Sequence, residues 1–484
     1  MSEKKSNALQ EMVLYGVALL LLKGASLITL PVMTHFLSVE QVGQLELIAV
    51  TQVFFALLIS LSMHENLYRF IAVAKGKLQQ KLMTSQLYCS AIFLSASLLI
   101  LIGIIYGIIE TVFNVSPIFN FFTQSQILLM VCALTIQGAL EISLAWLRLQ
   151  NKAAVFFKLS LFCTCLQVSL ILIVVNIIPS VTAVFAVGVF CAFIQLMILH
   201  HYNQFVFQLL SLSQLKQFLK YCLPIMWSAV VAFGLNGGER WVLMQAGNIE
   251  LLAQYAIALK FALAVGILLQ PFHMWWMPKR FEYWQNQGPQ ITAKISQSGM
   301  IYAGLLTILV AWVGKLFITL YLPTQYQLAA SLVGVATIAM LFKELAELTN
   351  IGLLKAQQTK TLLTINVVIA VTTLFLVVLA VQLYPQYSIW LICYSVAFAQ
   401  MIRCCVIFIF SQRLDYLPYQ FTAMTVFLSL TVLFAATTWL TDSLMTGVIF
   451  ATSQICVLLI FAQMYHLISF PYQHVRKAMQ RLNI

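Results

Sequence analysis

The feature that most constrains this chain is a series of long apolar segments that recur along its whole length. A helix needs about 20 mostly apolar residues to cross the hydrocarbon core of a bilayer, and fourteen stretches of the sequence meet this requirement. They lie near 11–33, 42–63, 84–109, 125–148, 156–178, 181–203, 217–246, 252–275, 295–320, 328–352, 361–384, 388–411, 419–440 and 446–468. We therefore predict an all-α polytopic membrane protein with about 14 transmembrane helices.

The amount of charge agrees with this prediction. Of the 484 residues, 62% are hydrophobic and only 8% are charged, whereas a soluble domain has about 25% charged residues. A single chain of this length cannot hide so much apolar surface from water. The first apolar segment lacks a small-residue cleavage site, so we expect it to remain as a spanning helix and not to be removed as a signal peptide.

The net charge of +12 does not indicate a nucleic-acid partner. Lys and Arg occupy short gaps between apolar segments, such as Lys77 and Lys81, whereas the alternate gaps carry Glu40, Glu110 and Glu250. Positive residues gather in the cytoplasmic loops of membrane proteins. We therefore expect a multi-pass protein of a bacterial inner (cytoplasmic) membrane, with both termini in the cytoplasm.

Two short sequence segments each occur twice in the chain, and the two copies are separated by nearly the same number of residues in both cases. Residues 38–45 resemble residues 248–255, and residues 146–152 resemble residues 353–360, at offsets of 210 and about 207. Six predicted helices, an even number, separate the copies, so both copies have one orientation in the membrane. We predict two pseudo-symmetric six-helix lobes, 1–205 and 206–415, followed by two extra C-terminal helices and a cytoplasmic tail in 416–484.

Several ionisable side chains fall inside the predicted helices. Each costs about 2.5–3.5 kcal/mol to insert at a helix centre, so it should face a partner or a polar cavity. Lys23 has no acidic residue three or four positions away. Together with Arg240 and Lys260, it is predicted to form a cationic site supplied by both lobes; the alternative for Lys23 is an ion pair with Glu46.

A second set of ionisable residues is predicted to act in gating or proton coupling. An ion pair within one helix is the alternative for Lys343 and Glu347, which lie four residues apart. Arg403 is expected to extend toward the membrane surface. The set comprises Glu46, Glu141, Glu239, Lys343, Glu344 and Glu347.

The second predicted helix ends in the polar sequence His64-Glu65-Asn66, followed by Arg69. We expect a solvated helix end there, with an inner gate as the alternative. The ten cysteines show no metal-ligand spacing matched by other Cys or His residues, and we expect them to act as small buried hydrophobic residues. No metal or cofactor is expected.

Four stretches carry a resemblance to a known family. They are the apolar segment around Lys23, Leu37-Ser-Val-Glu-Gln-Val-Gly, Leu149-Gln-Asn-Lys and Gly238-Glu-Arg-Trp-Val-Leu. The sequence resembles Wzx-type polysaccharide flippases of the multidrug/oligosaccharidyl-lipid/polysaccharide (MOP) superfamily over essentially its whole length. Many members of that family carry Asp where this chain has Glu239.

The resemblance implies that the chain moves an oligosaccharide on undecaprenyl pyrophosphate to the periplasmic leaflet by alternating access, for O-antigen or capsular or exopolysaccharide synthesis. Lys23, Arg240 and Lys260 would then bind the pyrophosphate or an anionic glycan. In the related lipid II flippase the two extra helices form a groove for the lipid tail, and 419–440 and 446–468 are expected to do likewise. The implied partners are the lipid-linked oligosaccharide, membrane lipid, a polysaccharide polymerase and a chain-length regulator.

Two other functions remain open at this point. A multidrug or cation antiporter of the same superfamily would place carboxylates, more than cations, in its N-terminal lobe. A membrane-embedded polysaccharide polymerase or ligase would need a sizeable outer loop with Arg, His or carboxylates, but the longest predicted outer loop, 110–124, contains no Lys, Arg or His. The sequence also lacks the phosphate-binding motif G-x-x-x-x-G-K-[ST]. A secondary transporter is therefore favoured over an enzyme.

Overall fold

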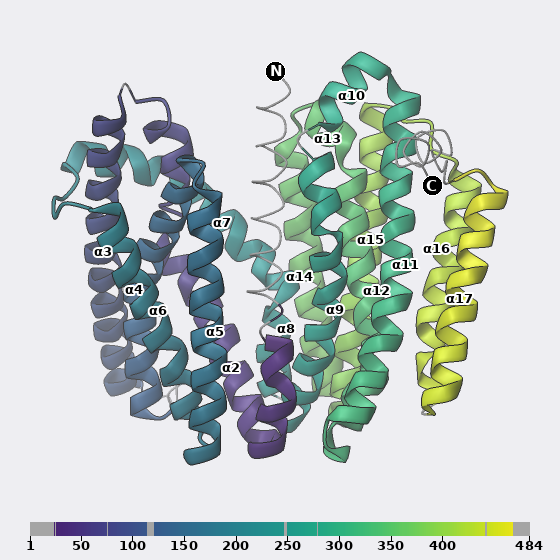
Figure 1. Ribbon diagram of the computed structural model, residues 1–484, viewed down its shortest axis with the longest axis horizontal. Coiled ribbons are helices and arrows are strands. Elements are labelled where there is room, and N and C mark those ends of the chain that lie inside the picture. The colour runs from purple at the N-terminus through teal and green to yellow at the C-terminus, as the bar shows by residue number, and fades with distance from the viewer. Residues whose placement is uncertain are drawn as a thin grey trace, which may run out of the picture. The chain divides into compact units, whose positions relative to one another are not determined.

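The computed structural model describes residues 24–467, apart from 25, 75, 114–120, 246–248, 278 and 441–442. Every regular element within these residues is a helix (Figure 1). Thirteen helices are long and apolar enough to cross a membrane, and each matches one predicted segment from 42–63 onward. The first predicted segment lies mostly outside the described residues, and only the apolar helix Ser26–Phe36 covers its end. The chain is thus a multi-pass α-helical membrane protein.

The chain divides into two compact units. Unit 1 comprises residues 1–260, 321–326 and 366–396, and unit 2 comprises 261–320, 327–365 and 397–484. The units interleave along the sequence, and their boundaries fall inside long helices that include α9 (Ile249–Trp276), α14 (Thr359–Leu383) and α15 (Ser388–Leu414). The division into lobes at residue 205 stays a prediction.

The remaining elements of unit 1 are mostly long helices. They are α2 (Val39–Ser60), the π-helix η1 (Leu67–Ile71), α3 (Lys77–Phe113), α4 (Gln124–Leu149), α5 (Ala153–Ile177), α6 (Val181–Asn203), α7 (Leu212–Asn236), α8 (Gly238–Gln245) and the short 3-10 helices η3 (Thr324–Tyr326) and η4 (Pro385–Tyr387).

Unit 2 contains two long helices, α11 (Pro289–Tyr321) and α12 (Gln327–Thr349), and several shorter ones. The shorter ones are α10 (Arg280–Gln287), α13 (Ile351–Lys355), α16 (Phe421–Ala436), η5 (Thr437–Leu440) and α17 (Leu444–Met464).

Capping boxes define the starts of three helices of unit 1. The hydroxyl of Ser38 accepts the backbone N–H of Gln41, and the Gln41 side chain accepts the backbone N–H of Ser38. The same reciprocal arrangement begins α4 at Thr123 and α7 at Ser211. Each box satisfies backbone donors that have no partner within the helix. The boxes explain why α2 and α7 begin a few residues before their predicted apolar segments.

The predicted internal repeat has a local structural counterpart. Helices α2 and α9 begin at Val39 and Ile249, at the offset of the first repeated segment. After α4, Asn151 has a left-handed φ of 56°, and after α13, Gln357 has a φ of 55°. The backbone N–H groups of residues 150–152 and 356–358 donate in the same order to carbonyls three to five residues back. Two segments distant in sequence therefore form the same turn.

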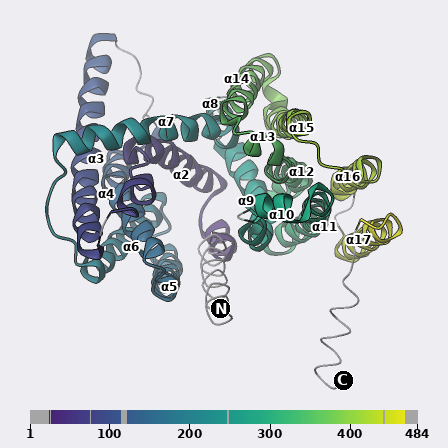
Figure 2. The same cartoon turned by 90° about the horizontal axis from the view of Figure 1, so that it is seen from above.

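Helices α16 and α17 lie side by side at the edge of unit 2 (Figures 1 and 2). Polar contacts join α11 to α17 and to η5, which follows α16. The indole Nε1 of Trp312 donates to Oε1 of Gln454 over 2.8 Å, and Nε2 of Gln454 donates to the hydroxyl of Thr437 over 2.9 Å. Lys315 donates to the backbone carbonyl of Thr438. These bonds satisfy polar groups that would be costly to leave unpaired in a membrane.

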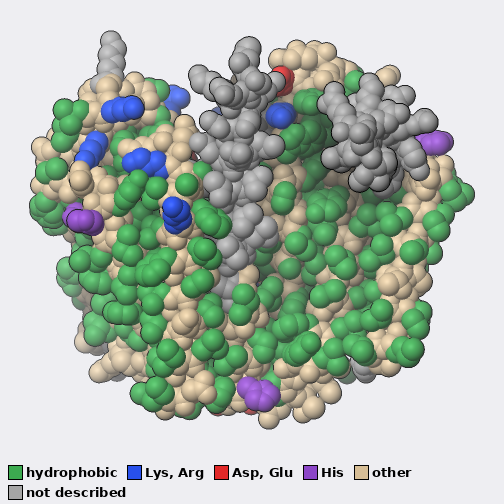
Figure 3. Space-filling model, viewed as in Figure 1, with side chains coloured by type: hydrophobic (Ala, Val, Ile, Leu, Met, Phe, Trp, Pro, Cys, Tyr) green, Lys and Arg blue, Asp and Glu red, His purple; other side chains and the backbone are tan. Residues whose placement is uncertain are grey.

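The surface is that of a membrane protein. Figure 3 shows one face, on which hydrophobic side chains predominate, while the Lys and Arg side chains over α3–α6 gather toward the upper end of the view.

The cysteines fit the prediction only in part: six are buried, but Cys132, Cys165, Cys405 and Cys456 are exposed. Exposure to lipid costs an apolar thiol little, which hydropathy alone does not distinguish from burial.

Candidate functional site

An ion pair between two helices forms the centre of the candidate site in unit 1. Glu46 lies two turns into α2 and is 8% exposed, and its carboxylate pairs with the ammonium group of Lys260 on α9. Sequence reasoning placed Glu46 beside Lys23 as an alternative. Lys23 lies outside the described residues, and the structure gives Glu46 the partner Lys260.

A glycine allows α2 to lie against the start of α9. A Cβ atom on Gly43 would collide with the backbone carbonyl of Ile249, the first residue of α9. Gly43 is three residues before Glu46 and therefore on nearly the same face of α2. Close contact at Gly43 thus fixes how near α2 lies to the start of α9, the helix that carries Lys260.

Arg240 adds a second positive charge to this cluster. It is the third residue of α8, and its charge acts on the Glu46 carboxylate. The Nε atom of Arg240 is buried without an acceptor, and among the described residues of unit 1 the guanidinium forms neither a hydrogen bond nor an ion pair. The cluster of Glu46, Arg240 and Lys260 therefore carries one more positive than negative charge.

The adjacent Glu239 points to a different neighbour, as its position in the sequence predicts. It is 3% exposed, and the hydroxyl of Tyr255 on α9 donates to its Oε1 over 3.4 Å. Tyr255 is itself 1% exposed. Glu239 thus helps to hold α8 against α9.

The position of α8 depends on residues that sequence reasoning did not select. Helix α7 ends at Asn236 because Gly237 adopts a non-helical backbone, and a side chain there would overlap the ring of Phe233. The indole of Trp241 then donates to the hydroxyl of Thr51 on α2 over 3.2 Å. Its ring lies 4.7 Å from that of Phe54, edge to face. The Gly-Gly sequence indicated that α7 ends there. The contacts of Trp241 could not be predicted, because one more aromatic residue is not distinctive in so apolar a chain.

Glu141 contacts the segment that follows α2. Its Oε2 lies 3.2 Å from Nδ1 of His64, and its Oε1 accepts a hydrogen bond from Gln137 over 3.0 Å. The expectation of a solvated helix end is wrong for Asn66, which is fully buried and donates to Sγ of Cys222 on α7. This polar sequence packs between helices because His64 contacts Glu141 on α4 and Asn66 contacts Cys222 on α7.

A separate polar network in unit 2 contains the other predicted carboxylates. Glu344 on α12 lies 3.5 Å from Nδ1 of His273 on α9. Glu347 accepts from Arg403 on α15 over 3.1 Å and from Asn350 over 3.1 Å. The expectation for Arg403 is therefore wrong, because this side chain is 9% exposed and paired within the unit. Lys343, on the same helix, is half-buried.

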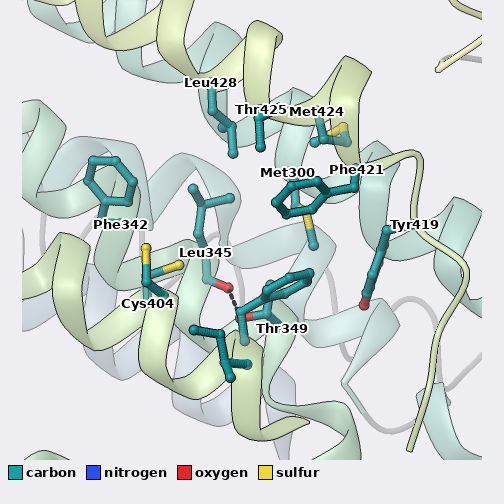
Figure 4. A pocket seen from close by; sticks show the side chains of 13 residues that line it. Met300, Phe342, Leu345, Thr349, Cys404, Tyr419, Phe421, Met424, Thr425 and Leu428 are labelled. Carbon is teal, nitrogen blue, oxygen red and sulfur yellow. Dashed lines mark hydrogen bonds between the residues drawn. The ribbon is translucent and has the colours of Figure 1, made fainter. Parts of the chain in front are cut away.

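An apolar cavity of about 290 Å³ lies between α11, α12, α15 and α16 of unit 2. Figure 4 shows Phe342, Leu345, Phe421, Met424 and Leu428 around it. The hydroxyl of Thr349 at its wall donates to the backbone carbonyl of Leu345 over 2.9 Å. The wall is thus suited to a hydrocarbon chain and not to a polar ligand.

The arrangement of helices is similar to that of solved transporter structures. These include the lipid II flippase MurJ in an inward closed conformation (13% identity, 96% of this chain and 99% of that chain covered, TM-score 0.63). A MOP superfamily transporter from Pyrococcus furiosus (10%, 86% and 96%, 0.52) and the MATE transporter VcmN from Vibrio cholerae (13%, 85% and 98%, 0.51) are also similar. No protein family and no curated protein matches the sequence. The chain therefore has the fold of MOP superfamily transporters.

Proposed function

We propose that this protein is a flippase that moves an oligosaccharide linked to undecaprenyl pyrophosphate from the cytoplasmic to the periplasmic leaflet of a bacterial inner membrane. The product would serve O-antigen or capsular or exopolysaccharide synthesis. The observation that carries the proposal is the guanidinium of Arg240, which is near enough for its charge to act on Glu46 and has no acceptor of its own in the described part of unit 1.

The chemistry of this cluster matches a diphosphate. A guanidinium binds phosphate oxygens through two parallel hydrogen bonds, whereas an ammonium group acts as a point charge. Glu46 neutralises only one of the two cations while the site is empty. A diphosphate would bind Arg240 and compete with Glu46 for Lys260, and in this proposal Lys23 adds a third positive charge.

The apolar cavity of unit 2 supports the lipid part of the proposal. It borders α16, one of the two extra C-terminal helices, and its wall offers Phe342, Phe421 and Leu428 to a hydrocarbon. Burial of each CH₂ group contributes about 0.8 kcal/mol. A segment of the prenyl chain could therefore be bound there while the headgroup is bound elsewhere.

The direction of transport follows from the proposed topology, in which both termini and the Lys- and Arg-rich loops are cytoplasmic. The membrane potential favours outward movement of negative charge by about 2.3 kcal/mol per charge per 100 mV. A headgroup of charge −2 would gain roughly 4–5 kcal/mol per 100 mV by this rule. Alternating access then requires no nucleotide, and a polymerase and a chain-length regulator would act on the delivered product.

The test is a flipping assay in proteoliposomes with a fluorescent undecaprenyl-pyrophosphate oligosaccharide. We expect an inside-negative potential to accelerate transport, and Arg240→Gln to slow it at least about tenfold. Arg240→Lys should retain part of the rate, because it keeps the charge but loses the paired hydrogen bonds. The exposed Arg413→Gln serves as the control for a change of charge alone.

Two outcomes would contradict the proposal. One is an equal rate for the wild type and Arg240→Gln. The other is proton-driven efflux of organic cations without any movement of the lipid-linked sugar, which would identify a multidrug antiporter. Lys23→Ala is expected to abolish flipping in a protein that still folds, and wild-type activity of that variant would remove Lys23 from the site.

A further inference from the structure

A second cluster of titratable groups lies at the other end of α2, in the segment that leads to α3. This segment begins with two successive residues in the left-handed region, Leu61 with a φ of 50° and Ser62 with a φ of 52°. Neither residue is a glycine, so the backbone is strained there and needs contacts from its surroundings to hold it. Both side chains are buried.

Contacts of two residues just beyond the strained turn, His64 and Asn66, supply this support. Nδ1 of His64 lies 3.2 Å from Oε2 of Glu141 on α4, and Nε2 of His64 lies 3.3 Å from Oε1 of Glu65. The amide of Asn66 donates to Sγ of Cys222 on α7 over 2.9 Å. The segment is thereby attached to two different helices of unit 1.

The positions of the two carboxylates determine which form of the imidazole fits. A neutral imidazole has one N–H and can donate to only one of two carboxylates, whereas an imidazolium has two N–H groups. Nδ1 of His64 lies 3.2 Å from a carboxylate oxygen of Glu141 and Nε2 lies 3.3 Å from one of Glu65, so each nitrogen is within ion-pair distance of a carboxylate. Only the protonated ring can donate to Glu65 and Glu141 at the same time.

We propose that His64 is a proton-binding site that latches the end of α2 to α4. With a proton bound, the imidazolium bridges Glu65 and Glu141 and holds the strained turn in place. Loss of the proton leaves one carboxylate facing a nitrogen lone pair, so the turn relaxes and Asn66 moves away from Cys222. This proton-binding site is distinct from the Arg240 cluster and does not depend on the substrate.

The charges around the His64 ring also favour its protonated form. Burial lowers the pKa of His64, but the carboxylates of Glu141 and Glu65 raise it more than burial and Arg148 lower it, so the pKa lies above its ordinary value. Among the described residues, α3 adds no charge to this set, and α7 contributes the thiol of Cys222 through Asn66. A raised pKa means that the latch is fully stabilised below about pH 6.5 and released as the pH rises through the raised pKa.

Cys222 provides a native reporter of this latch because it is fully buried beneath Asn66. The purified protein would be pulsed with N-ethylmaleimide between pH 5.5 and 8.5, and labelling of the Cys222 peptide measured by mass spectrometry. Comparison with His64→Gln at each pH removes the intrinsic effect of pH on thiol reactivity. We expect wild-type Cys222 to react at least fivefold more slowly than in His64→Gln at pH 5.5, and equally fast at pH 8.5.

Two further variants make the test decisive. Glu141→Gln keeps the histidine but removes the carboxylate that most raises its pKa. The pH at which Cys222 labelling rises should therefore be lower in this variant. His201→Gln removes an exposed histidine on α6 and should match the wild type at every pH. The proposal is overturned if Cys222 is labelled at the same rate in the wild type and in His64→Gln throughout the pH range. It is also overturned if Glu141→Gln leaves the midpoint pH of Cys222 labelling unchanged. Neither result depends on a transport assay.

Discussion

The carboxylate of Glu46 on α2 forms an ion pair with the ammonium group of Lys260 on α9, and the positive charge of Arg240 also acts on this carboxylate. The pair is therefore not symmetric in its surroundings. If Lys260 is lost, Glu46 retains a cation nearby. If Glu46 is lost, two cations remain together without a counterion.

This asymmetry predicts unequal effects of neutral substitutions on stability. Glu46→Gln should lower the free energy of unfolding by roughly 3 kcal/mol, since removal of one partner leaves a buried charge uncompensated. Lys260→Met should cost clearly less, and the double variant less than Glu46→Gln alone. Thermal unfolding in detergent measures the stability losses of the three variants and so gives their order. Equal losses for the two single variants would show that Arg240 does not stabilise Glu46.

The contact at Gly43 predicts a second effect. Gly43→Ala would place a methyl group against the carbonyl of Ile249 and force α2 and α9 apart, at a cost of about 1–3 kcal/mol for overpacking. Gly107→Ala on α3 is the matched control, because no atom lies within 4 Å of a Cβ there. Alanine favours a helix over glycine, so the control should be neutral or slightly more stable. A comparison of melting temperatures distinguishes the two; a harmless Gly43→Ala would disprove the close contact.

The attachment of α17 to α11 predicts a loss of stability when Gln454 is replaced. Gln454→Leu leaves the indole N–H of Trp312 without its acceptor, which should cost about 1–2 kcal/mol. Ser453→Ala, at the exposed neighbouring position, should have almost no effect. Thermal unfolding of the two variants side by side is the measurement, and similar melting temperatures would contradict the prediction.

The apolar cavity predicts a functional effect without a loss of folding. Met424→Trp would fill the space between α12, α15 and α16, and in the proposed function should slow flipping at least about tenfold by excluding the prenyl chain. Leu433→Trp adds the same ring to α16 at a site that is 58% exposed and should leave flipping unchanged. Normal flipping by a folded Met424→Trp protein would remove the cavity from the transport path.

The sequence predicted the helices well because their signal is local. Thirteen described spans match predicted segments, and the Gly-Gly pair marked the end of α7. The partners of the intramembrane charges were harder to predict. Nothing near Glu46 points to Lys260, and Arg403 looked peripheral because depth along a helix does not reveal which face is buried. Such pairs depend on tertiary packing, which hydropathy does not encode.

The identical turns at Asn151 and Gln357 bear on the predicted internal repeat of the chain. The same backbone shape occurs twice although most side chains around it differ, which supports the prediction of two repeated halves. At the offset of 210, Val50 corresponds to Lys260 and Ala256 corresponds to Glu46. Neither charge has a counterpart at the equivalent position, so the Glu46–Lys260 ion pair lies outside the repeated pattern and would distinguish the two halves in function.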